Sequence, residues 1–525
     1  MRRVVGSLLT GLVAAATLAA CSAGPSTRPA IAVIETGLAP PTSSATPADP
    51  PPPALQAPVA DLPWTDCTSS TLSRLGLTSR QPGLVLECAT LPVRLDAALP
   101  ASLPLGLLRA RVAQTPRDAA PVVLTTGVEQ PSTTALATLA ASGDAGGLAA
   151  RPVVAVDRRG VGTSAALTCL KPEQRAGIED VDPGAPGDPL AAALLLGRDA
   201  TQVCTDAISP AEAVFDATHA AADLEALRIA WKVDRLSLLG VGDGATIALR
   251  YAVAHPAQIA RLVLDSPAVP GADEVTLAKN QAIGAEAAFA AFASVCGASC
   301  PAGGDPRATV ADLMQRARTS GGLTAAGGRR LSAGAILLAV GQALRSPAGI
   351  QGLGSALATA AAGDATALAV YLDQAAGGGT PGNPGTAIDA EFVGHCSDAA
   401  LRPTPEQVST LVAQWRKDYP LFGASSAARL LLCLSWPTPP TPPPVTKLDA
   451  VSPVLVLEPK ADPVVGIAGA PATLIDVQQA GSDGTMLNWQ GTGHPVFLSS
   501  PCARAAVSTY VTDGTRPALG TVCPP

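Results

Sequence analysis

The alternation of short apolar runs with longer amphipathic stretches is the clearest pattern in the first half of the chain. Four short apolar runs end in loops, at residues 121–125, 152–157, 236–240 and 259–265. Runs of this kind are typical of strands that are buried on both faces of a parallel sheet. Two stretches with apolar residues at helical spacing, 211–230 and 245–255, lie between them. The alternation predicts a wound α/β sheet.

The pattern changes after residue 270. Residues 271–445 are rich in Ala, are broken by Gly and Pro, and have almost no strand pattern. Apolar runs resume at residues 454–458 and 473–477, and the second of these is predicted to be the last strand; early strands are predicted at 93–95 and 103–112. The expected organisation is a sheet domain in two parts, 63–270 and 446–525, interrupted by a helical cap at 271–445.

The first residues carry an export pattern. Arg2 and Arg3 precede an apolar run that ends at Ala20, so residues 1–20 are predicted to be a signal peptide. The sequence Leu-Ala-Ala-Cys21 resembles a bacterial lipobox, which implies cleavage before Cys21 and a lipid on it. An ordinary secretory signal with an incidental Cys21 is the alternative. Residues 21–62, rich in Pro, Ala, Ser and Thr, are predicted to be an extended tether. We expect a lipid-anchored protein on the extracytoplasmic face of the membrane.

The composition limits the class of partner. Hydrophobic residues make up 47% of the chain, charged residues 15%, and the formal net charge is −7. This apolar content is sufficient for a sizeable core. A mildly acidic chain has no basic surface that could bind a phosphate backbone. Nucleic acid is therefore excluded as a partner.

Ten cysteines remain when Cys21 is set aside, an even number in a chain with an export signal, which favours disulfides. Pairing between neighbours along the chain is the working hypothesis: Cys67–Cys88, Cys169–Cys204, Cys296–Cys300, Cys396–Cys433 and Cys502–Cys523. A zinc site is the alternative, but the chain has no pair of Cys-x-x-Cys motifs and its four histidines are scattered. No metal or cofactor is expected.

Several motifs resemble, in the same order, those of the secreted tripeptidyl and prolyl aminopeptidases. The matching segments are 157–164, 222–228, 238–256, 461–463 and 493–502 with the ending through Cys523. The resemblance covers roughly residues 64 to 525. It implies an α/β-hydrolase fold, a mostly parallel central sheet flanked by helices, with an inserted helical cap. It also implies a Ser–Asp–His triad that cleaves short peptides from free N-termini, or esters. Arg158 and Arg159 are interpreted as part of a turn with a stabilising charge pair.

The triad is incomplete when the family's motifs are carried over to this chain. Asp462 stands at the position of the acid and His494 at the position of the base. The turn that should read Gly-x-Ser-x-Gly reads Gly240-Val241-Gly242-Asp243-Gly244. Gly242 therefore occupies the position of the nucleophile and has no side chain that could attack a carbonyl group.

The oxyanion region also departs from the family. The family has a Gly-rich loop after the strand at 121–125, whereas this chain reads Thr126-Gly127-Val128-Glu129-Gln130-Pro131. Gly127 is retained, Val128 follows it, and Glu129 adds a carboxylate to which the sequence assigns no function. Asp243 is the residue whose backbone N–H should face the oxyanion. A negative charge there is expected to repel the oxyanion and to suit the start of a helix.

These departures predict a pseudoenzyme, a tethered hydrolase-like protein that binds a ligand in the pocket between sheet and cap. The expected ligand is a peptide, a lipid, a cell-wall component or a protein partner. An active exopeptidase or esterase is the alternative, with Asp243 or Ser266 in place of the serine. A purely structural envelope protein is a third hypothesis.

Overall fold

The computed structural model of the protein describes residues 52–116, 118–143, 146–375, 387–437 and 444–525. The predicted signal peptide, the lipid site at Cys21 and most of the predicted tether lie outside these residues. The described end of the tether lies against the sheet domain. The backbone N–H of Val59 donates to the carbonyl of Trp231 (2.9 Å), and Arg261 donates to the carbonyl of Pro53 (3.0 Å).

Ten strands of the described residues form one sheet, in the order β1-β2-β3-β5-β4-β6-β7-β10-β11-β12. The strands are β1 (Thr65–Asp66), β2 (Leu84–Arg94), β3 (Ser102–Val112), β4 (Val122–Thr125), β5 (Val153–Val156), β6 (Leu236–Val241), β7 (Ile259–Asp265), β10 (Val454–Ala461), β11 (Gly484–Thr492) and β12 (Val522–Cys523). From β1 to β5 neighbouring strands are antiparallel, and from β5 to β12 they are parallel. This is an α/β-hydrolase sheet, as the sequence predicts.

The central strands are buried on both faces because helices cover the sheet on both sides. The covering helices are α1 (Thr68–Arg74), α2 (Ser132–Ala141), α5 (Ala217–Trp231), α6 (Asp243–Ala254), α15 (Gly469–Gln479), α16 (Val496–Ser499) and α17 (Pro501–Asp513). Side chains of α5, α6 and α15 form the apolar core on one face, and those of α2, α16 and α17 form the core on the other. Every residue of β4, β6 and β7 is buried, which explains their continuous apolar runs.

One predicted element is wrong, and another begins later than predicted. Residues 473–477 are part of helix α15 and not the last strand, which is β11 followed by the short β12. Thr473 and Val477 are both fully buried and lie four residues apart, so they share one face of a helix. The helix predicted from residue 211 begins at Ala217, because the carboxylate of Asp216 accepts hydrogen bonds from the N–H groups of its first turn.

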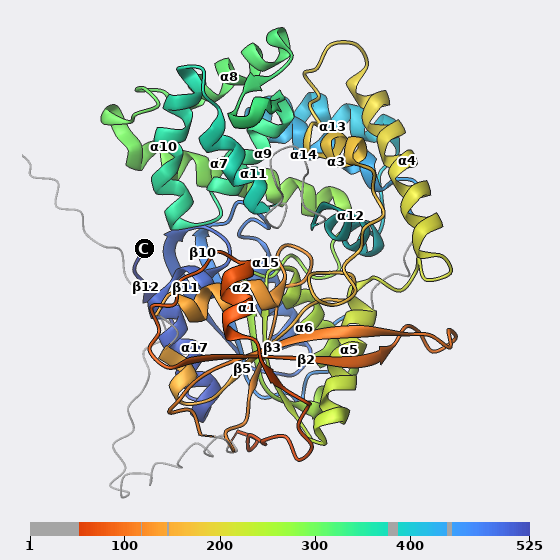
Figure 1. Ribbon diagram of the computed structural model, residues 1–525, viewed down its shortest axis with the longest axis vertical. Coiled ribbons are helices and arrows are strands. Elements are labelled where there is room, and N and C mark those ends of the chain that lie inside the picture. Colours follow the sequence, from red (N-terminus) through yellow and green to blue (C-terminus); the bar gives the residue numbers. More distant parts are fainter. Residues whose placement is uncertain (1–51, 117, 144–145, 376–386, 438–443) are drawn as a thin grey trace, which may run out of the picture. The chain divides into compact units, whose positions relative to one another are not determined.

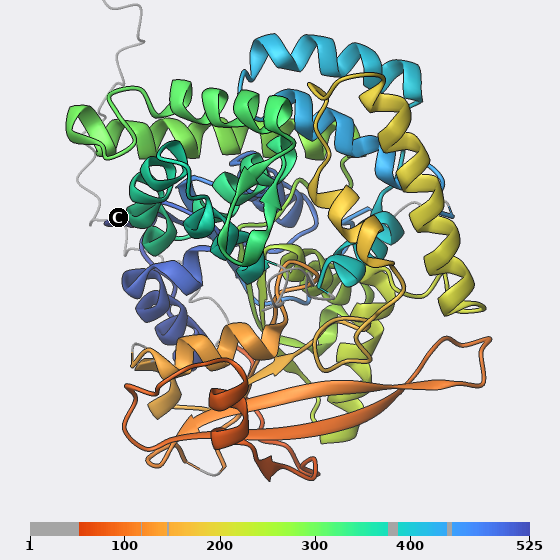
Figure 2. The same ribbon diagram turned by 45° about the horizontal axis from the view of Figure 1, so that its top comes forward.

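The cap is a set of helices gathered on one side of the sheet domain (Figures 1 and 2). Its helices are α7 (Glu274–Cys296), α8 (Pro306–Ser320), α9 (Ala333–Ala343), α10 (Pro347–Ala361), α11 (Thr366–Ala375), α12 (Ala387–Asp398), α13 (Pro405–Asp418) and α14 (Gly423–Arg429), with the short η5 (Leu430–Cys433) and a two-stranded ribbon of β8 (Leu323–Thr324) and β9 (Arg330–Leu331). Helices α3 (Pro172–Glu179) and α4 (Pro189–Ile208), which precede the predicted cap, pack in the same apolar cluster as α12–α14.

Helix α7 is long and apolar enough, by length and composition, to cross a membrane. In the structure it packs through Ala285, Phe289 and Phe292 into the apolar cluster of the cap. Its apolar character therefore has an explanation in the fold itself.

Within the described residues five disulfides join the neighbouring cysteines that the sequence pairs: Cys67–Cys88, Cys169–Cys204, Cys296–Cys300, Cys396–Cys433 and Cys502–Cys523. The fourth joins α12 to η5 inside the cap. The fifth ties α17 to β12 at the edge of the sheet.

Gly284 of α7 sets how closely the cap approaches the sheet domain. A Cβ atom at this position would overlap the carbonyl oxygen of Asp462. We predict that Gly284→Ala lowers the free energy of unfolding by about 1–3 kcal/mol, because backbone on both sides must shift. Gly341→Ala is the control: it also lies in a cap helix, but its Cβ would meet nothing closer than 3.9 Å. We expect Gly341→Ala to be neutral or stabilising. Equal effects in chemical denaturation would contradict this account of the contact.

Candidate active site

The turn at the end of β6 has the geometry of a nucleophile elbow. Strand β6 ends at Val241, Gly242 follows with φ 58° and ψ −124°, and α6 begins at Asp243. The helix starts so close to β4 that a Cβ atom at Gly244 would overlap the carbonyl oxygen of Thr125. The positive φ of Gly242 is a conformation that residues with side chains seldom adopt. The fold thus keeps the elbow although the serine is absent.

Asp462 and His494 lie beside this turn. Asp462 follows β10, and its Oδ1 accepts hydrogen bonds from the N–H groups of Val464 (2.8 Å) and Val465 (3.0 Å). His494 follows β11, and its Nδ1 lies 2.8 Å from Oδ2 of Asp462. Both side chains are fully buried. A Cβ atom at Gly242 would stand 2.6 Å from Nε2 of His494, so the structure brings these three positions together.

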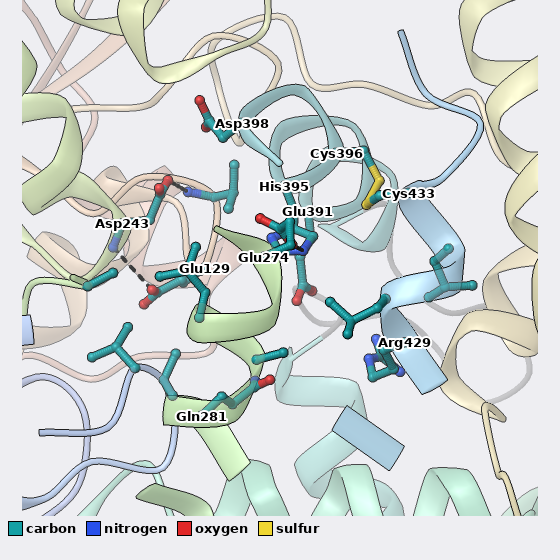
Figure 3. Close-up of a pocket in the computed structure, with 18 of the residues that line it drawn as sticks. Glu129, Asp243, Glu274, Gln281, Glu391, His395, Cys396, Asp398, Arg429 and Cys433 are labelled. Carbon is teal, nitrogen blue, oxygen red and sulfur yellow. Dashed lines mark hydrogen bonds and ion pairs between the residues drawn. A yellow bond between two sulfur atoms is a disulfide. The ribbon is translucent and has the colours of Figure 1, made fainter. Parts of the chain in front are cut away.

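The carboxylate of Glu129 occupies the place that a serine hydroxyl would take. Its Oε2 lies 2.7 Å from Nε2 of His494, and a Cβ atom at Gly242 would stand 2.5 Å from the same oxygen. Its Oε1 accepts a hydrogen bond from the backbone N–H of Asp243 (3.1 Å; Figure 3). Arg345, which follows the cap helix α9, lies 3.3 Å from Oε2. The sequence alone assigned Glu129 no function. The available signal was a carboxylate in a loop where the resembling family has glycines.

Both backbone donors of the expected oxyanion hole are engaged by carboxylates of the chain itself. The N–H of Asp243 donates to Glu129, and the N–H of Val128 donates to Oδ2 of Asp243 (2.9 Å; Figure 3). Gly127 makes room for this arrangement, because a Cβ atom there would overlap the side chain of Asp243. An oxyanion hole needs donors aimed at the reacting oxygen. Here these donors point at Glu129 and Asp243.

His494 is held between two carboxylates, and this determines its charge. Burial by itself would lower the pKa of His494, but the charges of Asp462 and Glu129 outweigh it and raise the pKa to about 10. Burial would likewise raise the pKa of Glu129, whereas the charge of His494 lowers it. The ring is therefore an imidazolium at neutral pH. A protonated imidazole cannot accept a proton as a general base.

Asp243 belongs to an ion-pair network that reaches into the cap. Its Oδ2 lies 2.9 Å from Nη1 of Arg158, whose Nη2 lies 2.8 Å from Asp398 at the end of α12. The side chain of Arg158 is fully buried, and Arg159 pairs with Asp223 of α5 (2.6 Å). The predicted turn is present, since the N–H of Val161 donates to the carbonyl of Arg158 (2.9 Å), but the charge partners of both arginines lie outside it. Their partners are distant in sequence and come close only when the chain folds.

The two residues considered as replacement nucleophiles have other partners. The hydroxyl of Ser266 donates to Oδ1 of Asp265 (2.9 Å) at the end of β7. Asp265 also accepts from the N–H groups of Val496 and Phe497, and burial raises its pKa to about 6. Asp243 holds Arg158 and the N–H of Val128 through one oxygen. Neither side chain is a hydrogen-bond partner of His494, whose ring nitrogens contact Asp462 and Glu129.

A cavity of about 340 Å³ lies between this site and the cap (Figure 3). Glu129 and Asp243 line it on the side of the sheet, while His494 is buried behind Glu129. The cap lines it with polar residues of three elements (Glu274 and Gln281 of α7, Glu391, His395 and Asp398 of α12, Arg429 of α14). Among the described residues, His, Cys, Asp and Glu side chains form no cluster of three or more that could hold a metal ion.

The comparisons with known proteins agree with the site. The family described as TAP-like protein matches residues 419–523, which include Asp462 and His494. The serine protease Hip1 of Mycobacterium tuberculosis is 27% identical over 321 residues, or 58% of this chain and 61% of Hip1. The tripeptidyl aminopeptidase of Streptomyces lividans is 27% identical over 398 residues, or 71% of this chain and 70% of that protein. The chain thus spans about three fifths of the length of Hip1.

The structure of a proline iminopeptidase from Mycobacterium smegmatis is also similar. It is 16% identical, with a TM-score of 0.35, and the match covers 81% of this chain and 97% of that one. The strand order, the elbow and the Asp–His pair are those of an α/β-hydrolase fold. Residues 419–523 match the TAP-like family, and the chain is a homologue of tripeptidyl aminopeptidase and of Hip1.

Proposed function

We propose that this protein does not hydrolyse its ligand and acts as a binding protein that uses the cavity between sheet and cap. One observation carries the proposal. The carboxylate of Glu129 fills the space between His494 and the N–H of Asp243, where a catalytic serine and the reacting carbonyl oxygen would both have to stand. Acyl transfer needs a nucleophile, a free base and an oxyanion hole. Gly242 provides no nucleophile, and Glu129 holds both the base, His494, and one donor of the oxyanion hole, the N–H of Asp243.

The electrostatics of the site support the same conclusion. A carbonyl oxygen that becomes negative during attack would meet the carboxylates of Glu129 and Asp243 rather than two free N–H groups. Negative charges next to the developing oxyanion raise the energy of the transition state. The imidazolium of His494 has its proton already and is paired on both nitrogens. Binding without turnover is what this arrangement can perform.

A short peptide is the ligand that we propose. Hip1 is named a serine protease and the Streptomyces relatives are named tripeptidyl aminopeptidases, so the relatives act on peptides. The cavity lies at the low end of the range of about 300–1,000 Å³ that is usual for small-molecule sites. Its walls combine apolar side chains with carboxylates, arginines and a histidine. These groups suit a molecule with charged ends and a neutral middle.

We further propose that the protein acts outside the cytoplasm, anchored through a lipid on Cys21. The lipobox-like Leu-Ala-Ala-Cys21 and the preceding apolar run support this location. The five disulfides support it independently, because disulfides persist in oxidising compartments. Mass spectrometry of the protein extracted from membranes tests the anchor. A diacylated Cys21 as first residue is expected, and an unmodified earlier or later N-terminus would contradict it.

Covalent reactivity tests the proposed lack of hydrolysis. We expect the wild-type protein to remain unlabelled by a fluorophosphonate probe and to leave short peptides uncleaved. We expect Gly242→Ser alone to remain unlabelled as well, because its Cβ would stand 2.5 Å from Glu129 and 2.6 Å from His494. The crowding and the positive φ should lower its free energy of unfolding by about 1–3 kcal/mol.

The combination of Glu129→Gly with Gly242→Ser is expected to gain slow labelling, because it frees the ring of His494 and the N–H of Asp243. The same double variant with His494→Ala is the matched control and should be inert. Robust turnover by Gly242→Ser alone would show that Glu129 does not block the site. An acyl adduct on any residue of the wild type, Asp243 and Ser266 included, would overturn the proposal.

The charge of His494 can be measured by its titration. Its pKa is raised from 6.5 to about 10 in the folded protein, so the ring should stabilise the fold fully below pH 6.5. This stabilisation should then be lost as the pH rises through about 10. Nitrogen NMR of the ring at pH 8 should show both nitrogens protonated. Glu129→Gln removes one of the two negative charges next to the ring and should lower the pH midpoint of its titration. A wild-type ring that titrates near 6.5 would contradict the charge assignment.

A further inference from the structure

Arg429 is a cavity residue whose charge lacks a partner. It is the last residue of α14, it is half-buried, and it lines the cavity on the cap side (Figure 3). Its Nη1 donates to the carbonyl of Ile178 (2.8 Å), and no carboxylate of the described residues lies within ion-pair distance of it. The other two arginines of the cavity differ. Arg402 donates to four backbone carbonyls, and Arg250 lies 4.0 Å from Asp398.

A guanidinium at this position lowers the stability of the fold unless an anion pairs with it. Burial lowers the pKa of Arg429, which reflects the loss of water around the charge. A charged group that is removed from water without a counter-ion destabilises the fold. Glu391 and Glu179 act on Arg429 from a longer distance, and burial raises the pKa of Glu179 to about 7, so its negative charge is incomplete at neutral pH.

The elements around Arg429 are cross-linked by a disulfide. The Cys396–Cys433 disulfide joins α12 to η5, which follows Arg429 directly, and both cysteines line the cavity. Ser426, one turn earlier in α14, also lines it. The guanidinium is therefore held on elements that are cross-linked to each other. A planar guanidinium on a rigid support is the side chain best suited to bind a carboxylate through two parallel hydrogen bonds.

Carboxylates line the end of the cavity on the side of the sheet, whereas the cap side has Arg429 together with the carboxylates of Glu274 and Glu391 (Figure 3). Glu129 and Asp243 line it on the side of the sheet, and Asp398 lies next to Asp243 across Arg158. A ligand carboxylate is repelled at that end, whereas a ligand ammonium group is attracted. Apolar residues such as Leu277, Phe392 and Leu430 also line the cavity. The guanidinium of Arg429, which has no ion-pair partner among the described residues, is the group that favours a ligand anion on the cap side.

We infer that Arg429 binds the terminal carboxylate of a short peptide that lies in the cavity with its amino end towards the sheet. The inference rests on the proposed peptide-binding function and adds a requirement to it: the ligand must have a free carboxyl end. The size of the cavity limits the ligand to a few residues.

Isothermal titration calorimetry with trialanine and with trialanine amide tests this inference on the full-length protein. Wild type should bind trialanine about 10- to 100-fold more tightly than the amide, as expected when a charged hydrogen-bonded pair is lost. Arg429→Met should weaken the binding of trialanine by a similar factor and leave the binding of the amide unchanged. Arg429→Lys keeps the positive charge but cannot form two parallel hydrogen bonds. Its affinity for trialanine should therefore lie between those of wild type and Arg429→Met.

Arg416→Met is the matched control. Arg416 lies exposed on α13, outside the cavity, and donates to the carbonyl of Pro183 (3.0 Å). This variant should bind both peptides as wild type does. Melting temperatures identify a variant that fails to fold. In that case the affinities of wild type for trialanine and for its amide still test whether the ligand needs a free carboxylate.

Equal affinity of wild type for trialanine and its amide would overturn the role of Arg429 and leave peptide binding intact. Binding of trialanine by Arg429→Met as tightly as by wild type would overturn that role in the same way. Absence of binding of either peptide to wild type would overturn the proposed peptide-binding function, and the role of Arg429 with it.

Discussion

The imidazole ring of His494 lies between the carboxylates of Asp462 and Glu129, and the charge on this ring organises the rest of the site. The first contact is the acid–base pair of a hydrolase. The second replaces the serine of such an enzyme with an internal anion. Because Glu129 also accepts the N–H of Asp243, one carboxylate occupies both the nucleophile position and part of the oxyanion hole. The donors that would stabilise a transition state therefore stabilise the resting protein instead.

The same cluster connects the sheet domain to the cap. Arg345 reaches Glu129 from the cap, and its carbonyl accepts the backbone N–H of His494 (2.8 Å). Arg158 extends from the sheet domain to Asp243 and to Asp398 of the cap. Breaking a buried ion pair by removing one partner usually costs several kcal/mol, since the remaining charge loses its compensation. The altered site thus has a structural role in addition to the ligand-binding role that we propose.

The proposed lack of catalysis and the proposed binding role are compatible because they depend on different residues. The elbow, Glu129 and His494 belong to the sheet domain, whereas Arg429, Glu391 and His395 belong to the cap. The cavity lies between them, and the carboxylates of Glu129 and Asp243 line one side of it. A peptide can be oriented by these two ends without any covalent step. The carboxylates of Glu129 and Asp243 would then contribute to ligand orientation.

The sequence by itself determined the fold class, the strands β3 to β7 and β10, the neighbouring cysteine pairs and the glycine at the elbow, because these depend on local spacing and on motifs contiguous along the chain. It missed the strands β1, β11 and β12 and most of β2, the helix at residues 473–477, where apolar spacing was mistaken for a strand, and the role of Glu129. Only the tertiary structure decided the partners of Glu129, Arg158 and Arg429. The physical reason is sequence distance: Glu129 and His494 are 365 residues apart, and nothing local specifies that their charges meet.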